Sequence, residues 1–337
     1  MAKKLKVIQI GTEHDHACQA MGSLRRQDGL FEVMGYVMPE EDTVSVYEAN
    51  KAFYEGVPCL SLQEALSIPG LDGAVIETSD KFLVKYARVA VGRGLAVQMD
   101  KPGSNSAEEF DLLMEEAENG GKGFQLGYMY RFNPAILELY EAVRKGELGE
   151  ILYINAEMNC THKAWKREWL RDYPGGMMHF LGCHLVDVIF RLQGEPEEVI
   201  ALNQPSGLDG VKADDEGFAV FRYPSGVSFA RTTAVEKGGF MRRQFVVVGS
   251  RQTWEIRPTE YYRKTEDEKD LLTDYGVKEN DRWGDPGIWK TTEPYNRYDA
   301  MFRSFHEIAC GKKENDYSFE YEKKLYHLLL RACGIGA

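Results

Sequence analysis

Short apolar runs alternate with amphipathic segments along the first 126 residues of the chain. The apolar runs predict β-strands at residues 5–10, 31–37, 73–76, 95–99 and 123–128. The segments between them have apolar positions at helical spacing and predict helices at 14–26, 44–53, 61–66, 82–91 and 107–118. Strands that alternate with helices at such short intervals are typical of a parallel, doubly wound sheet.

The pattern changes after Tyr130, where longer strands follow one another. Helices are predicted at 133–145 and 177–192, and alternating positions predict strands at 150–160, 198–203, 216–223, 227–235, 242–248 and 253–257. The turn Pro224-Ser225-Gly226 is typical of a hairpin between two of these strands. We therefore expect an α+β domain with a large, mostly antiparallel open sheet, one face of which packs on helices. Segment 258–294 is predicted to be an irregular lid or arm, and helices at 298–310 and 319–333 close the chain.

Composition narrows the class of protein. A length of 337 residues suggests two domains, and a net charge of −12 argues against nucleic acid or an anionic membrane as the main partner. The six cysteines form no Cys-x-x-Cys pair, which favours free thiols in a reducing compartment. No apolar span approaches the roughly 20 residues of a membrane helix. The chain is therefore predicted to be cytoplasmic.

One acid and one lysine stand at the end of the predicted strand 95–99, in the sequence Asp100-Lys101-Pro102. A proline cannot donate to a sheet and disfavours a helical conformation in the residue before it, so Lys101 is expected to be extended there. Open α/β sheets bind their ligands at that edge. Lys101 is thus a candidate to present its ammonium group to a substrate oxygen. The alternative is a solvated charge pair in a strand-to-helix turn.

The turn after the first strand, Gly11-Thr12-Glu13-His14-Asp15-His16, lies where a dinucleotide-binding loop would lie. Such a loop needs the pattern G-x-G-x-x-G/A for a tight turn, close approach to the diphosphate and close helix packing. Only Gly11 fits, because Glu13 and His16 hold the other two positions. The second strand ends at Met38 rather than at the acid that binds ribose hydroxyls. His14 and His16 remain able to donate hydrogen bonds to phosphate.

A second candidate site lies in the predicted helix 177–192, which follows the pair Gly175-Gly176. His184 and Asp187 are at i, i+3 on one helical face, which suits a general base oriented by a carboxylate. His179 and Cys183 are at i, i+4, but no metal site is predicted because a third and a fourth ligand are not evident. The alternative for each histidine is a core residue with satisfied hydrogen bonds.

Segment 162–173 interleaves aromatic and charged residues, among them Trp165, Arg167 and Trp169. Such residues supply the flat surfaces and hydrogen-bonding arms that a polyol ring needs. The alternative is a surface loop whose tryptophans pack on the sheet.

Together these residues resemble the glucose–fructose oxidoreductase/inositol dehydrogenase/MocA (Gfo/Idh/MocA) family over essentially the whole chain. The resemblance rests on the Gly11 loop and on Asp100-Lys101-Pro102, which is similar to the family's Glu-Lys-Pro. It also rests on the segments 128–134 (YMYRFNP) and 175–187 (GGMMHFLGCHLVD).

The resemblance implies a Rossmann domain at 1–126, completed by the helix 319–334, and a substrate-binding and oligomerisation domain at 127–318. It implies NAD(P)-dependent hydride transfer at a hydroxyl carbon of a sugar, glycoside or cyclitol, in a homodimer or homotetramer formed through the C-terminal sheet. NAD is preferred over NADP, since no arginine closely follows Met38 to bind a 2′-phosphate. Lys101 would polarise the reacting oxygen, and His184 would take or give its proton.

The expected site residues form three sets. Catalysis is expected from Lys101, His184, Asp187 and His179. Cofactor contacts are expected from Gly11, Thr12, Glu13, His14, His16, Met38, Thr78, Ser79, Asp80, Asp100, Lys101 and Arg131. Substrate contacts are expected from Tyr130, Trp165, Arg167, Trp169, His179 and His184.

The chain differs from the family pattern near the expected catalytic base, His184. Many members carry an Asp four residues before the histidine, and Phe180 stands there in this chain. Either His179 or Asp187 is therefore expected to be the partner of His184. Two other functions stay open: redox-assisted elimination that cleaves a glycoside with tightly bound NAD, and non-catalytic binding of a sugar or dinucleotide.

Overall fold

The computed structural model describes residues 3–42, 44–264 and 269–336. The chain forms two compact units. One comprises Met1–Met129 with Tyr298–Tyr326, and the other comprises Tyr130–Arg297 with His327–Ala337. Residues 298–318, expected in the second domain, thus group with the first unit, and the helix 319–334, expected to complete the first domain, is divided between the two units. The division into a cofactor domain and a substrate domain remains a prediction.

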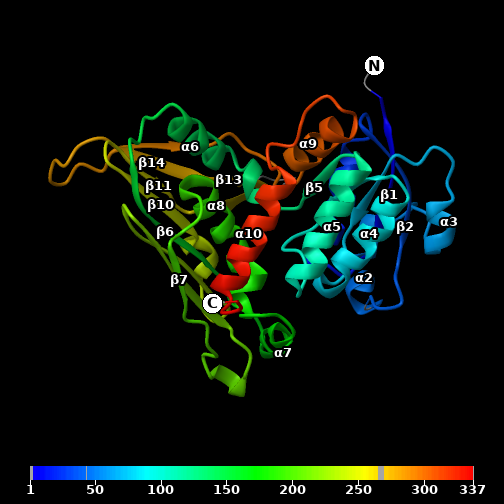
Figure 1. The fold of residues 1–337 in the computed structure, drawn as a ribbon, viewed down its shortest axis with the longest axis horizontal. Helices are drawn as coiled ribbons and strands as arrows, with labels where there is room; N and C mark the ends of the chain where they lie inside the picture. The colour runs from blue at the N-terminus through cyan, green and yellow to red at the C-terminus, as the bar shows by residue number, and fades with distance from the viewer. Residues whose placement is uncertain (1–2, 43, 265–268, 337) are drawn as a thin grey trace. The chain divides into compact units, whose positions relative to one another are not determined.

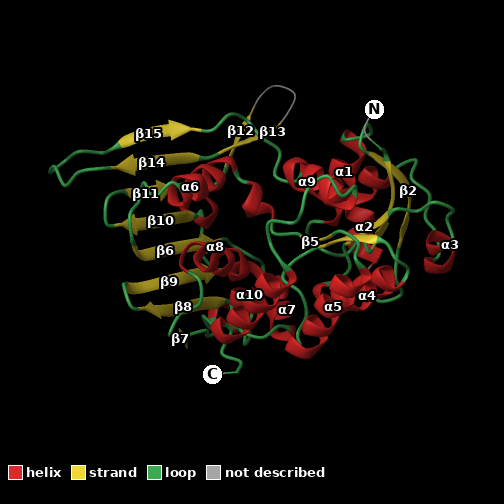
Figure 2. Cartoon of the chain, turned by 45° about the horizontal axis from the view of Figure 1, so that its top comes forward, coloured by secondary structure: helices red, strands yellow, loops and turns green. Residues whose placement is uncertain are grey.

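The first unit is built on a five-stranded sheet in the order β2-β1-β3-β4-β5, with every pair parallel. The strands are β1 (Leu5–Ile10), β2 (Phe31–Val37), β3 (Gly73–Ile76), β4 (Ala96–Met99) and β5 (Phe124–Leu126). The helices are α1 (Ala17–Arg26), α2 (Val44–Asn50), α3 (Leu62–Leu66), α4 (Leu83–Gly92), α5 (Ala107–Gly120) and α9 (Asp299–Ala309). Figure 2 shows the sheet between the helix pair α1 and α9 and the pair α4 and α5. Strands covered on both faces must be apolar throughout, and β3 and β4 are fully buried.

The second unit is built on an eight-stranded sheet in the order β15-β14-β11-β10-β6-β9-β8-β7. Its strands are β6 (Ile151–Asn159), β7 (Glu198–Ala201), β8 (Glu216–Tyr223), β9 (Gly226–Thr233), β10 (Gln244–Gly249), β11 (Thr253–Ile256), β14 (Asp274–Lys278) and β15 (Ile288–Thr291). Only β6 and β9 pair in parallel. The helices α6 (Pro134–Arg144) and α8 (Cys183–Gln193) lie against one face of this sheet, as Figure 1 shows. A short helix, α7 (Ala164–Trp169), precedes α8, and α10 (Phe319–Ala332) begins in the first unit and ends in the second.

The predicted fold class is confirmed in both units, with three local corrections. Helix α1 begins at Ala17 rather than at residue 14, so both loop histidines precede it. The predicted helix 177–192 begins with a π-helical turn, Met178–Gly182, and is regular only from Cys183. Segment 258–294 is more regular than predicted: outside 265–268, which are not among the described residues, it contains β14, β15 and a two-stranded antiparallel sheet of β12 (Tyr261–Lys264) and β13 (Lys269–Leu272).

In the described ranges, no helix is both long enough and apolar enough to span a bilayer.

Candidate active site

The carboxyl ends of the parallel strands bring three loops together. Ile10 is in register with Ile76 of β3, and Ile76 with Met99 of β4. The residues that follow these strands, Gly11, Glu77 and Asp100, therefore lie along one edge of the sheet. This is the edge at which open α/β sheets bind ligands.

Lys101 lies at this edge, directly after β4, as the sequence predicts. It is 2% exposed, and its peptide bond to Pro102 is cis. The backbone N–H of Lys101 donates to Oδ1 of Asp100 at 2.6 Å. Because Lys101 is almost fully buried, the alternative of a solvated charge pair does not apply. A buried ammonium group is costly unless it has polar partners.

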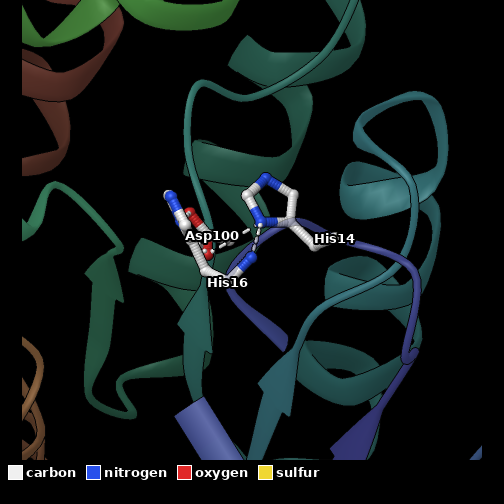
Figure 3. Close-up of side chains that lie close together, drawn as sticks. All are labelled: His14, His16 and Asp100. Atoms are coloured by element: carbon white, nitrogen blue, oxygen red, sulfur yellow. Dashed lines mark hydrogen bonds and ion pairs between the residues drawn. The ribbon is translucent and has the colours of Figure 1, made fainter. Parts of the chain in front are cut away.

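His14, His16 and Asp100 form a compact cluster beside Lys101 (Figure 3). The Nδ1 atoms of His14 and His16 lie 3.1 and 3.0 Å from Oδ2 of Asp100. Burial alone would lower the pKa of His14, but the carboxylates of Asp100 and Asp80 raise it well above its usual value. Burial lowers the pKa of His16. Both rings thus face the carboxylate of Asp100. The sequence predicted hydrogen bonds to phosphate for these histidines and did not predict this partner.

Carboxylates dominate the lining of this edge. Burial raises the pKa of Glu77 well above its usual value, and the nearby charge of Asp100 raises it further. Burial would also raise the pKa of Asp100, but His14 and His16 hold it well below its usual range. Thr78, Ser79 and Asp80 follow β3 and are buried as well.

The Gly11 turn is tight and closely packed, which is one feature of a dinucleotide-binding loop. Gly11 has φ +99°, and a Cβ atom there would lie 2.3 Å from the backbone nitrogen of Thr78. Only glycine fits such a position. The turn therefore meets the first of the three requirements of a dinucleotide-binding loop.

The rest of the loop is less suited to a diphosphate, because three of its backbone N–H groups already donate within the protein. Thr12 donates to Oδ2 of Asp42 at 2.6 Å, His14 to the carbonyl of Glu77 at 3.0 Å, and His16 to Nδ1 of His14 at 3.2 Å. The half-buried Glu13 adds a further carboxylate. The charges that line the loop are unusual for a diphosphate site.

The sequence reasoning missed Asp42 as the acid nearest to this loop. Met38 packs instead against an apolar cluster of Met21, Tyr36 and Tyr54. Asp42 lies four residues beyond Met38 and reaches back to Thr12. The sequence does show acids shortly after the second strand. It does not show which of them points towards the Gly11 loop, because residues in a loop have no regular spacing.

In the second unit, the predicted residues of α8 and its preceding turn are buried. His179 and His184 are both inside the protein. The ring of Tyr130 packs edge-on against His184, with centroids 4.9 Å apart, and His179 stacks on Tyr173. The hydroxyl of Tyr130 donates to Glu260 and accepts from Arg243.

Asp187 binds Arg131, which was expected to contact the cofactor. Nε of Arg131 donates to both oxygens of Asp187 at 3.1 and 3.0 Å, and Nη2 donates to Oδ1 at 2.8 Å. Both residues are buried. The predicted i, i+3 pairing of Asp187 with His184 thus misses the main partner of this carboxylate, which lies 56 positions away in the chain.

The aromatic segment divides into an exposed part and a structural part. Trp165 is 69% exposed, whereas Trp169 packs edge-on against Phe180 with centroids 5.4 Å apart. Phe180 belongs to a hydrophobic cluster with Leu170, Met177, Val211, Ala213 and Ala234. An apolar residue at the position of the family's Asp is therefore part of the core.

Arg167 does not present a free arm to a substrate. Its guanidinium is buried, donates to Oδ2 of Asp215 at 2.8 Å and to the carbonyl of Leu208 at 3.1 Å, and pairs with Asp209. These bonds commit Arg167 to the fold, so we no longer expect it to bind substrate.

Residues 136–255 match the family model described as the GFO/IDH/MocA C-terminal domain. A D-xylose 1-dehydrogenase (NADP(+)) from Haloferax volcanii is 28% identical over 177 residues, which cover 51% of this chain and 54% of that protein. A scyllo-inositol 2-dehydrogenase (NADP(+)) from Bacillus subtilis is 23% identical over 46% of this chain and 44% of that protein. The matched segments thus span about half the length of these relatives.

Solved structures share the fold over nearly the whole chain. An oxidoreductase from Thermotoga maritima has a TM-score of 0.77 at 18% identity and covers 98% of this chain and 96% of its own. An aldose-aldose oxidoreductase from Caulobacter crescentus has a TM-score of 0.76 at 18% identity, with 99% of each chain covered. The family model identifies residues 136–255 as a GFO/IDH/MocA C-terminal domain, and the chain as a whole shares the fold of these oxidoreductases.

Proposed function

We propose that this protein is an NAD(P)-dependent oxidoreductase that transfers a hydride to or from a hydroxyl carbon of a sugar, glycoside or cyclitol. The observation that supports this most directly is the buried Lys101 at the ligand edge of a parallel sheet whose first strand is followed by a tight glycine turn. Several relatives are named as xylose or inositol dehydrogenases, with NADP(+) or NAD(+) in their names.

In this proposal each polar residue has a limited role. Gly11, Thr78 and Ser79 would line the dinucleotide, and the bound nicotinamide would accept or supply the hydride. The ammonium group of Lys101 would bind the reacting oxygen and stabilise the negative charge that develops on it. His184 would hold or release the hydroxyl proton, as a general base or acid. We expect NAD to be preferred over NADP.

Dinucleotide binding is the first step to test. A ligand that binds only the folded protein at about a hundredfold excess over its Kd stabilises it by about 2.7 kcal/mol. We expect a thermal-shift titration to show a clear rise in Tm with NAD and a smaller one with NADP. A protein that shows no rise with either, and contains no co-purified nucleotide, would exclude the proposed activity.

Catalysis is tested by screening aldoses, glycosides and cyclitols for nicotinamide reduction and then replacing Lys101. Lys101→Ala should lower kcat by roughly 100- to 1000-fold, because it removes a positioned charge from the developing alkoxide. Lys122→Ala, which removes an exposed lysine of the same unit, is the matched control and should keep wild-type turnover. Full turnover by Lys101→Ala would contradict the proposal. Cofactor consumption of one equivalent per product separates a simple dehydrogenase from redox-assisted glycoside cleavage.

A second candidate function is non-catalytic binding of a sugar or dinucleotide. Three backbone N–H groups of the Gly11 loop already donate hydrogen bonds within the protein, so fewer donors remain for a diphosphate. This observation favours the non-catalytic function. It predicts saturable binding without turnover that is unchanged in His184→Ala. Any reproducible turnover by the wild-type protein would exclude it.

We also propose that the protein is a homodimer or homotetramer formed through the face of the eight-stranded sheet opposite to α6 and α8. Alternation along β6 and β9 places the exposed Tyr153 and Val227 on that face, while Ile154 and Ser228 are buried.

A further inference from the structure

Three atoms with lone pairs converge in the first unit at the ligand edge of the sheet. One ring nitrogen of His14, one of His16 and an oxygen of Asp100 all lie within 4.8 Å of one another. Nδ1 of His14 also accepts the backbone N–H of His16 at 3.2 Å, a hydrogen bond that an ion bound to this atom would replace. The two histidines come from the loop after β1, and Asp100 follows β4. The register of β1, β3 and β4 brings the start of this loop and Asp100 to the same edge of the sheet.

We propose that His14, His16 and Asp100 bind a divalent transition-metal ion of the zinc class. Two ligand atoms that are each about 2.1 Å from one ion lie roughly 3.0–3.4 Å apart at bond angles near 90–109°. The two nitrogen–oxygen distances at Asp100 are 3.1 and 3.0 Å. A pair as far apart as 4.8 Å must close by about 1.4 Å to share an ion at such angles, which needs a small rotation of the histidine rings. Two imidazoles with one carboxylate suit zinc, cobalt or iron better than magnesium or calcium.

The two oxygens of Asp100 are used differently. Oδ1 accepts the backbone N–H of Lys101 at 2.6 Å, which fixes the plane of the carboxylate. Oδ2 lies 3.1 Å from Nδ1 of His14 and 3.0 Å from Nδ1 of His16, and the latter nitrogen also lies 3.2 Å from Oδ1. Figure 3 shows the three side chains together. A single positive centre beside Oδ2 would thus meet all three ligands.

Neighbouring acids complete the surroundings that metal-binding histidines usually have. Nε2 of His14, on the side of the ring away from the proposed ion, lies 3.6 Å from Oδ1 of Asp80. A carboxylate at the far nitrogen orients a metal-bound imidazole and raises its basicity. Oε2 of Glu77 is buried 3.8 Å from Nδ1 of His14, and in the described part of the chain it has no hydrogen-bond donor. Glu77 is therefore available as a fourth ligand.

Charge supports the same assignment. Glu77, Asp80 and Asp100 are all buried, and the groups beside them that can carry positive charge include two imidazoles and the ammonium group of Lys101. Buried carboxylates are costly unless cations or hydrogen bonds compensate them. The side chain of His16 is 16% exposed, which leaves a route for an ion to enter. The proposed site does not depend on oxidoreductase activity, although the ion would also offset the acids where a diphosphate is expected.

The alternative is a proton in place of the ion, since the same distances suit two histidine–carboxylate hydrogen bonds. The two are separated by treating the full chain with EDTA, removing the chelator and titrating with zinc chloride by calorimetry. We expect one zinc ion per chain. Cobalt(II) should produce visible absorption bands typical of nitrogen and oxygen ligands, and zinc should abolish them. Absence of stoichiometric zinc binding and of cobalt bands in the wild-type protein would overturn the proposal.

Variants locate the bound ion. His16→Gln changes the least buried ligand and should weaken zinc binding by more than about 100-fold. His327→Gln removes an exposed histidine of α10 and should bind zinc as the wild type does. Wild-type affinity in His16→Gln, or loss of binding only in His327→Gln, would show adventitious surface binding and overturn the proposal. The cobalt spectrum of the wild-type protein decides the question even if His16→Gln does not fold.

Discussion

Asp42 shows how one buried side chain can make stability depend on pH. Burial raises the pKa of Asp42 to about 6, partly offset by the backbone N–H of Thr12. Because this folded-state pKa exceeds the unfolded value near 3.9, the folded protein binds the proton more tightly. The stabilisation from protonated Asp42 is complete below about pH 4 and is lost as the pH rises through about 6.

We therefore expect Asp42→Asn, which keeps an acceptor for Thr12 without the charge, to be more stable than the wild type at pH 7.5. The difference in free energy of unfolding should be at most about 3 kcal/mol at pH 7.5 and about half of that at pH 5. Urea unfolding at both pH values measures it. Glu40→Gln, at an exposed position two residues earlier, should show no such trend. An Asp42→Asn difference that is the same at both pH values would refute this account.

Gly11 tests the backbone of the dinucleotide turn. In Gly11→Ala the new Cβ atom would lie 2.3 Å from a backbone nitrogen, and the residue would have to adopt φ +99°. Gly56 also has positive φ (+76°) but has open space around its Cβ position. Gly56→Ala should cost about 1 kcal/mol of stability, and Gly11→Ala at least about 3 kcal/mol. Denaturant unfolding compares the two, and equal costs would mean that close packing at Gly11 is unimportant.

At the scale of the elements, the sequence pattern was sufficient to predict strands and helices where apolar positions recur regularly. It was not sufficient to predict the partners of individual side chains, which depend on contacts between distant parts of the chain. The five parallel strands and the helices between them follow from runs such as 5–10 and 73–76. The role of Asp187 could not be predicted, because helical spacing shows which residues share a face but not which residue of another element will meet that face. Arg167 was misjudged for the same reason, since its partners Asp209 and Asp215 lie in a distant loop.

The pair Arg131–Asp187 should hold α8 to the segment that precedes α6. Removing one partner of a buried ion pair leaves an uncompensated charge and costs about 3–5 kcal/mol. We expect Arg131→Met and Asp187→Leu each to lose about that much in urea unfolding, and the double variant to lose clearly less than their sum. Replacing the exposed pair Arg144–Glu141 should cost no more than about 0.5 kcal/mol. Additive losses at Arg131 and Asp187 would show that the pair is not coupled.

At the scale of the whole molecule, the sequence predicted the second sheet but not its strand order. The hairpin of β8 and β9 follows from the turn at 224–226. The parallel pairing of β6 with β9 joins strands separated by about 70 residues, and no local signal specifies it. The catalytic assignments of Lys101 and His184 remain predictions for a related reason, because spacing along a chain does not determine which groups meet one substrate.

The free face of this sheet should be where two copies of the chain associate. Phe218 and Phe229 stack on adjacent strands with centroids 5.4 Å apart, and Val227 on the same face is 53% exposed. Ile200 of β7 is also exposed. Arg222 and Arg231 lie on the same face, opposite Val227 and Phe218 in the pair β8–β9. Exposed apolar side chains on an open sheet face are typical of a surface that another protein covers, and a second copy presents the same patch.

Val227→Lys should therefore shift the protein towards monomer, because dimerisation would bury two lysines against apolar side chains. Sedimentation velocity over a range of concentrations measures the change, with an expected weakening of self-association of at least about tenfold, or about 1.4 kcal/mol. Leu137→Lys is the matched control, since Leu137 is 48% exposed on α6, which lies against the other face. If the wild-type protein is monomeric at micromolar concentration, or if Leu137→Lys dissociates it equally, association through this face is excluded. If only Val227→Lys dissociates the protein, the Tm of that variant is informative as well. A lower Tm in the dissociated variant would show that association stabilises the eight-stranded sheet.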